Sequence, residues 1–207
     1  MKNSRKIITD ILEELNVNSF IEMQKDYVGV PVDELLYSMI TKHHKVNLSK
    51  KLSDFYHSMS GCRIEWSCDL NKYQNIKKYN ADDTIITGEI YIKPVEEMLD
   101  FEKKLEADWW IKNLSEEERN DLHNFRSFDF NDDYTRVGFI IEDNALHDNK
   151  MVFITQESSG FSPTGLSFDQ YLEKIFQYKG FQGWQYNYFF QNTNNYKRMM
   201  FYLDQLF

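Results

Sequence analysis

A histidine and a cysteine lie five residues apart in the stretch LSDFYHSMSGCRIEW, residues 52–66. A cysteine nucleophile needs a base within hydrogen-bond reach and usually a third group that orients this base. On the helix that the stretch predicts, His57 lies off the apolar face, so we expect it to be exposed to solvent. A neighbouring acid, Glu65, would raise the pKa of the Cys62 thiol rather than lower it. The pattern therefore favours a surface histidine and a small packing cysteine over a catalytic pair.

The richest cluster of oxygen ligands is the segment FDFNDDY, residues 128–134. Asp129, Asn131 and Asp133 have the 1-3-5 spacing of a calcium-binding loop. The rest of that pattern is missing, because Tyr134 stands at the glycine position and Ile140 at the position of the bidentate glutamate. We interpret the segment as an acidic turn between two strands.

The histidines and cysteines also lack the spacing of a metal site. His43 and His44 are adjacent and point to different sides of a helix, and Cys62 and Cys68 form a lone C-x5-C pair. If both cysteines lie on one strand, a rise of ~3.3 Å per residue places them roughly 20 Å apart, and a disulfide spans only about 7 Å. We predict reduced, buried or half-buried thiols, no metal site and no cofactor.

Neighbouring acids such as Glu96 and Glu97 do not form an acid/base pair. Adjacent side chains diverge by about 100° on a helix, so these acids and those at 116–118 are typical of solvated helix faces. The sequence also lacks the G-x-x-x-x-G-K-[ST], G-x-G-x-x-G and G-x-S-x-G motifs. We therefore predict that the protein is not an enzyme.

The net charge of −9 indicates the kind of partner. Binding a phosphate backbone requires concentrated Lys and Arg, but here the positive charges are scattered. Ten aromatic residues lie between 181 and 207, yet Lys197 and Arg198 are the only basic residues close to them, too few for the groove of a single-strand binder. We expect no direct nucleic-acid binding, and an acidic surface suited to a basic protein.

Composition predicts one folded domain over residues 1–207. The chain is 42% hydrophobic and 16% aromatic, with three prolines and eight glycines, which argues against disorder and long linkers. The basic start and apolar run of residues 1–16 resemble a targeting peptide, but three acids interrupt the run. No segment has the ~18 apolar residues of a membrane span. We expect a cytoplasmic protein with no membrane contact.

Apolar spacing predicts helices at both ends of the chain. Amphipathic patterns cover residues 4–16, 32–40 and 49–59, with Gly61 as a left-handed C-terminal cap of the third helix. A helical insertion follows at 94–124 with a capping box at Ser115, and two further helices are predicted at 167–180, again with a capping box, and at 194–207.

Five runs rich in β-branched and aromatic residues predict strands at 62–68, 84–92, 125–130, 136–142 and 151–157. Helices, then sequential strands, then helices indicate an α+β fold. We expect a mostly antiparallel sheet of about five to six strands, flanked by N- and C-terminal helices.

Three segments resemble the SUKH superfamily, which includes the Smi/Knr-type proteins. LSKKLSDFYHSMSGCRIEW at 48–66 is similar to its helix–glycine–strand unit, TGEIYIKPVEEM at 87–98 to the next strand and its proline, and LSFDQYLEKIFQYKGFQGWQ at 166–185 to the closing helix. The residues that carry the resemblance are Phe55, Tyr56, Gly61, Trp66, Gly88, Pro94, Tyr171, Leu172 and Trp184. The resemblance implies a SUKH-like core at 46–190, an N-terminal helical extension at 1–45 and a C-terminal helix at 191–207.

The resemblance also implies a function without catalytic residues. Many bacterial members are immunity proteins that bind and block a cognate toxin, and many of these toxins are nucleases. Because a nuclease is expected to be basic, the partner surface is predicted from charge alone to include Glu96, Glu97, Glu116, Glu117, Asp129, Asp132 and Asp133. The alternatives are a regulatory or scaffold module of the same fold that binds an endogenous partner, and an unrecognised enzyme that uses His57 or the acidic loop.

Overall fold

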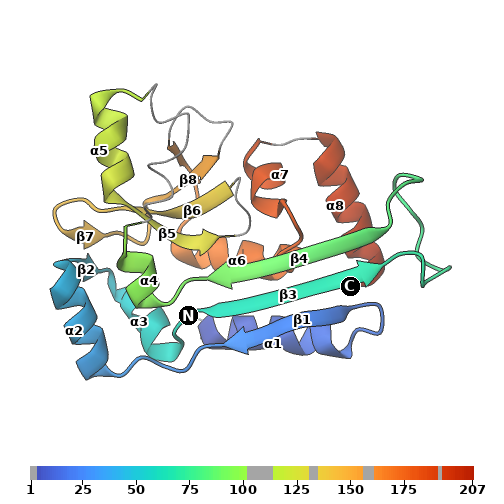
Figure 1. The fold of residues 1–207 in the computed structure, drawn as a ribbon, viewed down its shortest axis with the longest axis horizontal. Helices are drawn as coiled ribbons and strands as arrows, with labels where there is room; N and C mark the ends of the chain where they lie inside the picture. The colour runs from blue at the N-terminus through green and yellow to red at the C-terminus, as the bar shows by residue number, and fades with distance from the viewer. Residues whose placement is uncertain (1–3, 102–113, 131–134, 156–160, 191–192) are drawn as a thin grey trace.

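Seven strands form one antiparallel sheet in the computed structural model, in the order β1-β3-β4-β5-β6-β8-β9 (Figure 1). The structure describes residues 4–101, 114–130, 135–155, 161–190 and 193–207. The strands of this sheet are β1 (Glu22–Val28), β3 (Cys62–Asp69), β4 (Ile85–Ile92), β5 (Phe125–Phe130), β6 (Thr135–Ile140), β8 (Met151–Thr155) and β9 (Ser162–Pro163). Two short strands, β2 (Asn47–Leu48) and β7 (Ala145–Leu146), form a separate parallel pair.

Helices lie before, between and after the strands along the chain, and those at its two ends flank the sheet. They are α1 (Ser4–Val17), α2 (Glu34–His44), α3 (Lys50–Ser58), α4 (Val95–Leu99), α5 (Glu116–Asn124), α6 (Phe168–Tyr178), α7 (Trp184–Phe190) and α8 (Thr193–Leu206). The prediction of an α+β fold with a mostly antiparallel sheet is confirmed, with more strands than the expected five to six. None of the described helices is long and apolar enough to cross a membrane.

The two capping boxes lie where the sequence predicts them. Ser115 accepts a hydrogen bond from the backbone of Glu118, whose side chain accepts one from the backbone of Ser115, and Ser167 and Gln170 are paired in the same way. Each box satisfies two backbone donors that have no partner inside the helix, so it fixes where α5 and α6 begin.

One face of β3 and β4 is covered by helices and the other is open. In both strands buried and half-buried residues alternate, and the buried side carries Ile64, Trp66, Cys68, Ile86, Ile90 and Ile92. In Figure 1, α1 and α6 lie behind the sheet, and no described helix crosses the front of β1, β3 and β4. The polar residues of these strands therefore line an uncovered surface.

The sheet is split between β4 and β5. These strands pair only at Ile92 and Asp129, whereas β3 pairs with β4 over eight residue pairs. The other half of the β4 edge is occupied by the segment after α6. Glu89 N–H donates to Gly180 O at 2.7 Å, and Gln182 N–H donates to Thr87 O at 2.9 Å. This C-terminal segment thus pairs with β4 where β5 diverges from it.

Most of the residues that carry the family resemblance form the core around this junction. Phe55, Tyr56, Trp66, Tyr171, Leu172 and Trp184 are all buried. Tyr56 Oη donates to Lys93 O at 3.2 Å, next to Pro94, and Trp66 Nε1 donates to Lys179 O at 2.7 Å. They therefore act in packing rather than on the surface.

Gly61 is not the cap of α3. The helix ends at Ser58 with Met59 in an extended conformation. Gly61 follows with φ +76°, and an added Cβ would lie 2.4 Å from Ile92 O. The residue has the predicted left-handed conformation, but its role is to let β3 start close to the end of β4.

The N-terminal 45 residues contain more than the predicted helices. Strand β1 forms the edge of the sheet, and α1 adds Ile8, Ile11 and Leu15 to the same core as α6. The helix predicted at 32–40 is present as α2, and Val32 just before it is buried. The helix begins after Asp33, which accepts a hydrogen bond from Leu36 N–H, and no residue of α2 is buried.

The contact between Trp66 and Gly88 predicts a steric requirement for glycine. A Cβ at Gly88 would lie 2.3 Å from the indole of Trp66. We expect Gly88→Ala to lower the free energy of unfolding by about 1–3 kcal/mol or more, because the buried ring has no room to move. Urea denaturation measures this change.

Gly165→Ala is the matched control. Gly165 has φ +69° but nothing within 4 Å of an added Cβ, so only backbone strain of about 1–2 kcal/mol is expected. A smaller loss for Gly88→Ala than for Gly165→Ala would show that the indole does not fill the space above Gly88.

Candidate functional site

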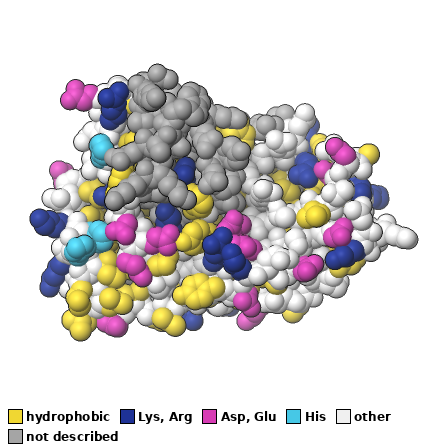
Figure 2. All heavy atoms as spheres, in the orientation of Figure 1, with side chains coloured by type: hydrophobic (Ala, Val, Ile, Leu, Met, Phe, Trp, Pro, Cys, Tyr) yellow, Lys and Arg dark blue, Asp and Glu magenta, His cyan; other side chains and the backbone are white. Residues whose placement is uncertain are grey.

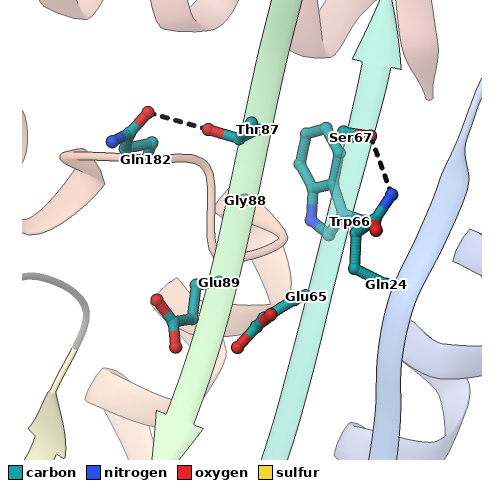
Figure 3. Close-up of a pocket in the computed structure, with 8 residues that line it drawn as sticks. All are labelled: Gln24, Glu65, Trp66, Ser67, Thr87, Gly88, Glu89 and Gln182. Atoms are coloured by element: carbon teal, nitrogen blue, oxygen red, sulfur yellow. Dashed lines mark hydrogen bonds between the residues drawn. The ribbon is translucent and has the colours of Figure 1, made fainter.

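The open face of β1, β3 and β4 contains a cleft of about 200 Å³ (Figure 3). It is lined by residues of all three strands and of the segment after α6, namely Gln24, Glu65, Trp66, Ser67, Thr87, Gly88, Glu89 and Gln182. Figure 3 shows the two carboxylates side by side at one end and two polar pairs at the other. Six of the eight lining residues have polar side chains and the others are Trp66 and Gly88, so the cleft offers charged and hydrogen-bonding groups beside an apolar surface.

Two side-chain hydrogen bonds fix the end of the cleft that lies opposite the carboxylates. Gln24 Nε2 donates to Ser67 Oγ at 3.3 Å, and Thr87 Oγ1 donates to Gln182 Oε1 at 2.7 Å. The second pair adds a side-chain bond to the backbone bonds between β4 and the segment after α6. Both sides of the cleft are therefore fixed to the sheet.

The carboxylate end is a network of four charges. Glu65 Oε1 lies 2.8 Å from Lys25 Nζ and 2.7 Å from Arg63 Nε, and Arg63 Nη2 lies 3.2 Å from Glu89 Oε1. Glu65 and Glu89 are direct partners in the register of β3 and β4. Two acids thus share one arginine across the strands, and the lysine binds only the first of them.

The two carboxylates differ in their affinity for a proton. Burial disfavours ionisation of Glu65, but hydrogen bonds and charge from Lys25 and Arg63 outweigh it and lower its pKa. Burial raises the pKa of Glu89, and the effect of Arg63 is opposed by the charge of Glu65. A further positive group beside Glu89 would stabilise its ionised form.

Tyr91 joins this network to α4. Its hydroxyl donates to Glu97 Oε1 at 2.7 Å, and the Arg63 guanidinium lies 5.0 Å from the centre of its ring. Burial and the bond to Glu97 raise the pKa of Tyr91 to about 12. Acidic side chains therefore continue from the cleft to α4, where Figure 2 shows several of them at the surface.

The structure divides the acids that were predicted for the partner surface. Glu96 and Glu97 are exposed on α4, and Glu116 is exposed on α5. The Glu117 side chain, Asp132 and Asp133 lie outside the described residues. Glu96 and Glu97 are therefore the predicted acids that lie next to the open face.

Asp129 is a correction, because it is not on the surface. It is 2% exposed and accepts hydrogen bonds at Oδ2 from Tyr171 Oη at 2.7 Å and from Gln185 Nε2 at 3.1 Å. Burial raises its pKa to about 7, although both hydrogen bonds favour the charged form. It closes the junction between β4, β5, α6 and α7, and no partner can reach it.

His57 and Cys62 also occupy different environments from those of a catalytic pair. Burial raises the pKa of the Cys62 thiol to about 12. His57 is half-buried rather than exposed as predicted, with Nδ1 3.0 Å from Val32 O and Nε2 3.3 Å from Glu34 Oε2. Both ring nitrogens thus have partners on the α2 side, away from a thiol that stays protonated at neutral pH.

Cys68 is buried too, and burial raises its pKa to about 11. Within the described ranges, no group of three or more His, Cys, Asp or Glu side chains is arranged to hold a metal ion. The predicted calcium-like segment runs into residues 131–134, which lie outside those ranges.

Sequence reasoning missed Glu65 and Glu89. Period-two alternation in CRIEWSCD and IITGEIYI could have placed both on the polar side of their strands. Their pairing across β3 and β4 depends on the register of two strands separated by a long loop, which alternation does not give.

The sequence matches no protein-family model, and a search among curated proteins finds no matching relative.

Asp129 predicts an unusual dependence of stability on pH. Between pH ~4 and ~7 the folded state keeps a proton on Asp129 that the unfolded state has released, so stability falls as the pH rises through this window. The rise from 3.8 to about 7 sets an upper limit of roughly 4 kcal/mol at ~1.4 kcal/mol per unit. Asp129→Asn should remove this loss.

Urea denaturation of the wild type and of Asp129→Asn at pH 5 and pH 8 measures this effect. Asp82→Asn, which changes an exposed acid, is the control and should follow the wild type. If Asp129→Asn lost as much stability between the two pH values as the wild type, the proton would reside elsewhere.

Proposed function

We propose that the protein is a non-enzymatic immunity protein, which binds a cognate bacterial toxin in the cytoplasm and neutralises it by direct contact. The observation that carries the proposal is the run of carboxylates at the edge of the open face, from Glu89 on β4, which shares Arg63 with Glu65, to the exposed Glu96 and Glu97 on α4. A surface of this kind offers several carboxylates to a basic protein without a covering helix. The resemblance to the SUKH superfamily supports the same function.

The state of the reactive side chains supports binding rather than catalysis. The Cys62 thiol is held protonated by burial, and both nitrogens of His57 are occupied. Asp129 is sealed in the core. A general base or nucleophile must contact its substrate. The Cys62 thiol and the Asp129 carboxyl are buried, and the ring nitrogens of His57 already have partners.

The proposed partner is a basic toxin domain, for example of a nuclease. Such a domain carries Lys and Arg side chains that bind phosphate, and carboxylates on a rigid sheet can occupy the same positions. Glu89 is suited to this role, because within the described part of the chain it forms an ion pair with an arginine that it shares with Glu65. A guanidinium or ammonium group beside Glu89 would offset the like charge of its neighbour.

Charge reversal on α4 tests the proposal. Glu96→Lys with Glu97→Lys should slow association with a cognate basic toxin domain by about tenfold, because acidic residues steer a basic partner. Stopped-flow fluorescence with an inactive form of that domain measures the rate, and co-expression with the active form measures protection.

The control pair, Asp82→Lys with Asp204→Lys, makes the same change of charge at exposed positions in the β3–β4 loop and on α8, at the opposite end of the view in Figure 1. It should change the rate less than twofold. Unabated killing by the active domain in the presence of the wild-type chain would overturn the immunity function and favour a regulatory or scaffold module.

A further inference from the structure

Helix α2 presents apolar side chains to solvent. Leu35 is 73% exposed, Leu36 47% and Met39 62%, and Val30 in the preceding loop is 71% exposed. The spacing of three and four residues places Leu35, Leu36 and Met39 on one side of the helix. We name these four residues the α2 apolar face. Figure 2 shows hydrophobic side chains gathered at this end of the molecule.

This face is not the side by which α2 packs on the protein. Tyr37 and Ile40 are half-buried against the core, and the Tyr37 ring lies 4.5 Å from that of His57. The helix thus has an apolar inner side that holds it in place and a second apolar side that contacts solvent. Clustered, exposed aliphatic residues of this kind mark interaction sites on soluble proteins.

Acidic residues border the α2 apolar face. Asp33 and Glu34 lie at the start of the helix, and the Glu34 side chain is 85% exposed. Helix α4 packs beside α2 and adds Glu96, Glu97 and Asp100, all exposed. Figure 2 shows acidic side chains over α4 next to the hydrophobic ones over α2.

We propose that the α2 apolar face is the anchor of the partner interface and that its occupant is a basic protein with apolar side chains at the centre of its contact surface. This inference deepens the proposed function and rests on it for the nature of the partner. Protein interfaces have this anatomy, with an apolar centre that supplies most of the binding energy and a polar rim. Here Asp33, Glu34, Glu96, Glu97 and Asp100 outnumber the exposed bases Lys42 and Lys45 at the end of α2, so the complementary rim is rich in Lys and Arg.

A second copy of this chain is a poorer occupant. The net charge is −9, and two copies meeting at this face would bring the acids of α4 and of the α2 start close to one another. Juxtaposed like charges cost several kcal/mol at an interface. The same charges attract a basic partner.

The two parts of the surface have different roles in binding. Rim acids speed the encounter and make it sensitive to salt, whereas burial of Leu35, Leu36 and Met39 lowers the dissociation rate. Loss of the apolar side chains should therefore shorten the lifetime of the complex and leave the association rate nearly unchanged.

A pair of designed peptides tests the site directly. The probe is a 16-residue amphipathic helix with leucines on one side and lysines around them, and its counterpart carries glutamates in place of the lysines. We expect the lysine peptide to shift amide NMR signals of α2 and α4 in the ¹⁵N-labelled chain, and the glutamate peptide to bind at least tenfold more weakly.

Matched variants keep the test specific. Leu35→Ser with Met39→Ser should weaken the lysine peptide at least tenfold, while Val17→Ser with Ile85→Ser, which removes exposed aliphatic groups elsewhere, should change it less than twofold. All four positions are exposed, so circular dichroism should show both double variants folded. Shifts confined to other elements, or equal binding of both peptides, would overturn the proposal.

Sedimentation of the chain alone addresses the other occupant. A dimer that Leu35→Ser with Met39→Ser converts to a monomer would assign the face to a second copy and overturn the basic partner. Failure of this inference differs from failure of the immunity function. Protection from the toxin that survives loss of Leu35 and Met39 contradicts only the anchor, whereas killing despite peptide binding at α2 contradicts only the immunity function.

Discussion

The contact of Trp66 with Gly88 and Lys179 is the constraint on which the rest of the fold depends. The indole lies over the one β4 position that has no side chain, and its N–H donates to the carbonyl of Lys179 just after α6. Lys179 has φ 52°, and its buried ammonium pairs with Glu14 of α1 at 2.5 Å and lies 4.0 Å from the ring centre of Phe176. One tryptophan thus fixes two strands, the closing helix and the first helix relative to one another.

This arrangement also determines what fills the edge of β4. Lys179 and Gly180 both have positive φ, so the chain turns back after α6 and Gly180–Gln182 pairs with β4. The segment occupies the part of the β4 edge that β5 does not use, because β5 pairs with β4 at Asp129 and diverges from it there. The helices pack behind this junction, where the apolar residues of β3 and β4 point. The front keeps the polar residues, and the cleft extends over β1, β3, β4 and the returning segment.

The sequence predicts the regular elements well where local signals and burial agree. The helix at 168–178 has a capping box and a continuous buried stripe, and β3 and β4 alternate over eight residues each. Strand β1 was missed because EMQKDYV is an edge strand. An edge strand has little to bury, and its charged residues resemble a loop while they protect the edge from unwanted pairing. Helix α7 was missed because its aromatic run has no start signal that differs from a loop.

The site could be predicted only in part, because periodicity reports that a residue is apolar or polar but not what lies beside it. The composition of FDFNDDY indicates an acidic turn. Asp129 nevertheless lies in the core, because β5 is covered where it meets α6 and α7.

The amphipathic pattern at 32–40 locates a helix correctly but does not tell which of its apolar residues are buried. This pattern is that of a core helix, and only the three-dimensional structure shows that Tyr37 and Ile40 suffice to hold α2 while Leu35 and Met39 remain outside. A local conflict between pattern and burial is expected where function rather than folding selects the residues.

The acidic residues around the α2 apolar face limit self-association of the free protein. Four exposed aliphatic side chains are unfavourable in water and would favour self-association if their neighbours were neutral. The acids at the start of α2 and on α4 oppose contact between two copies and leave contact with a positively charged surface favourable. The apolar side chains alone would bind many partners weakly, and the acids alone would attract any cation. Together on one end of the molecule, they select a partner that is apolar at its centre and basic at its rim.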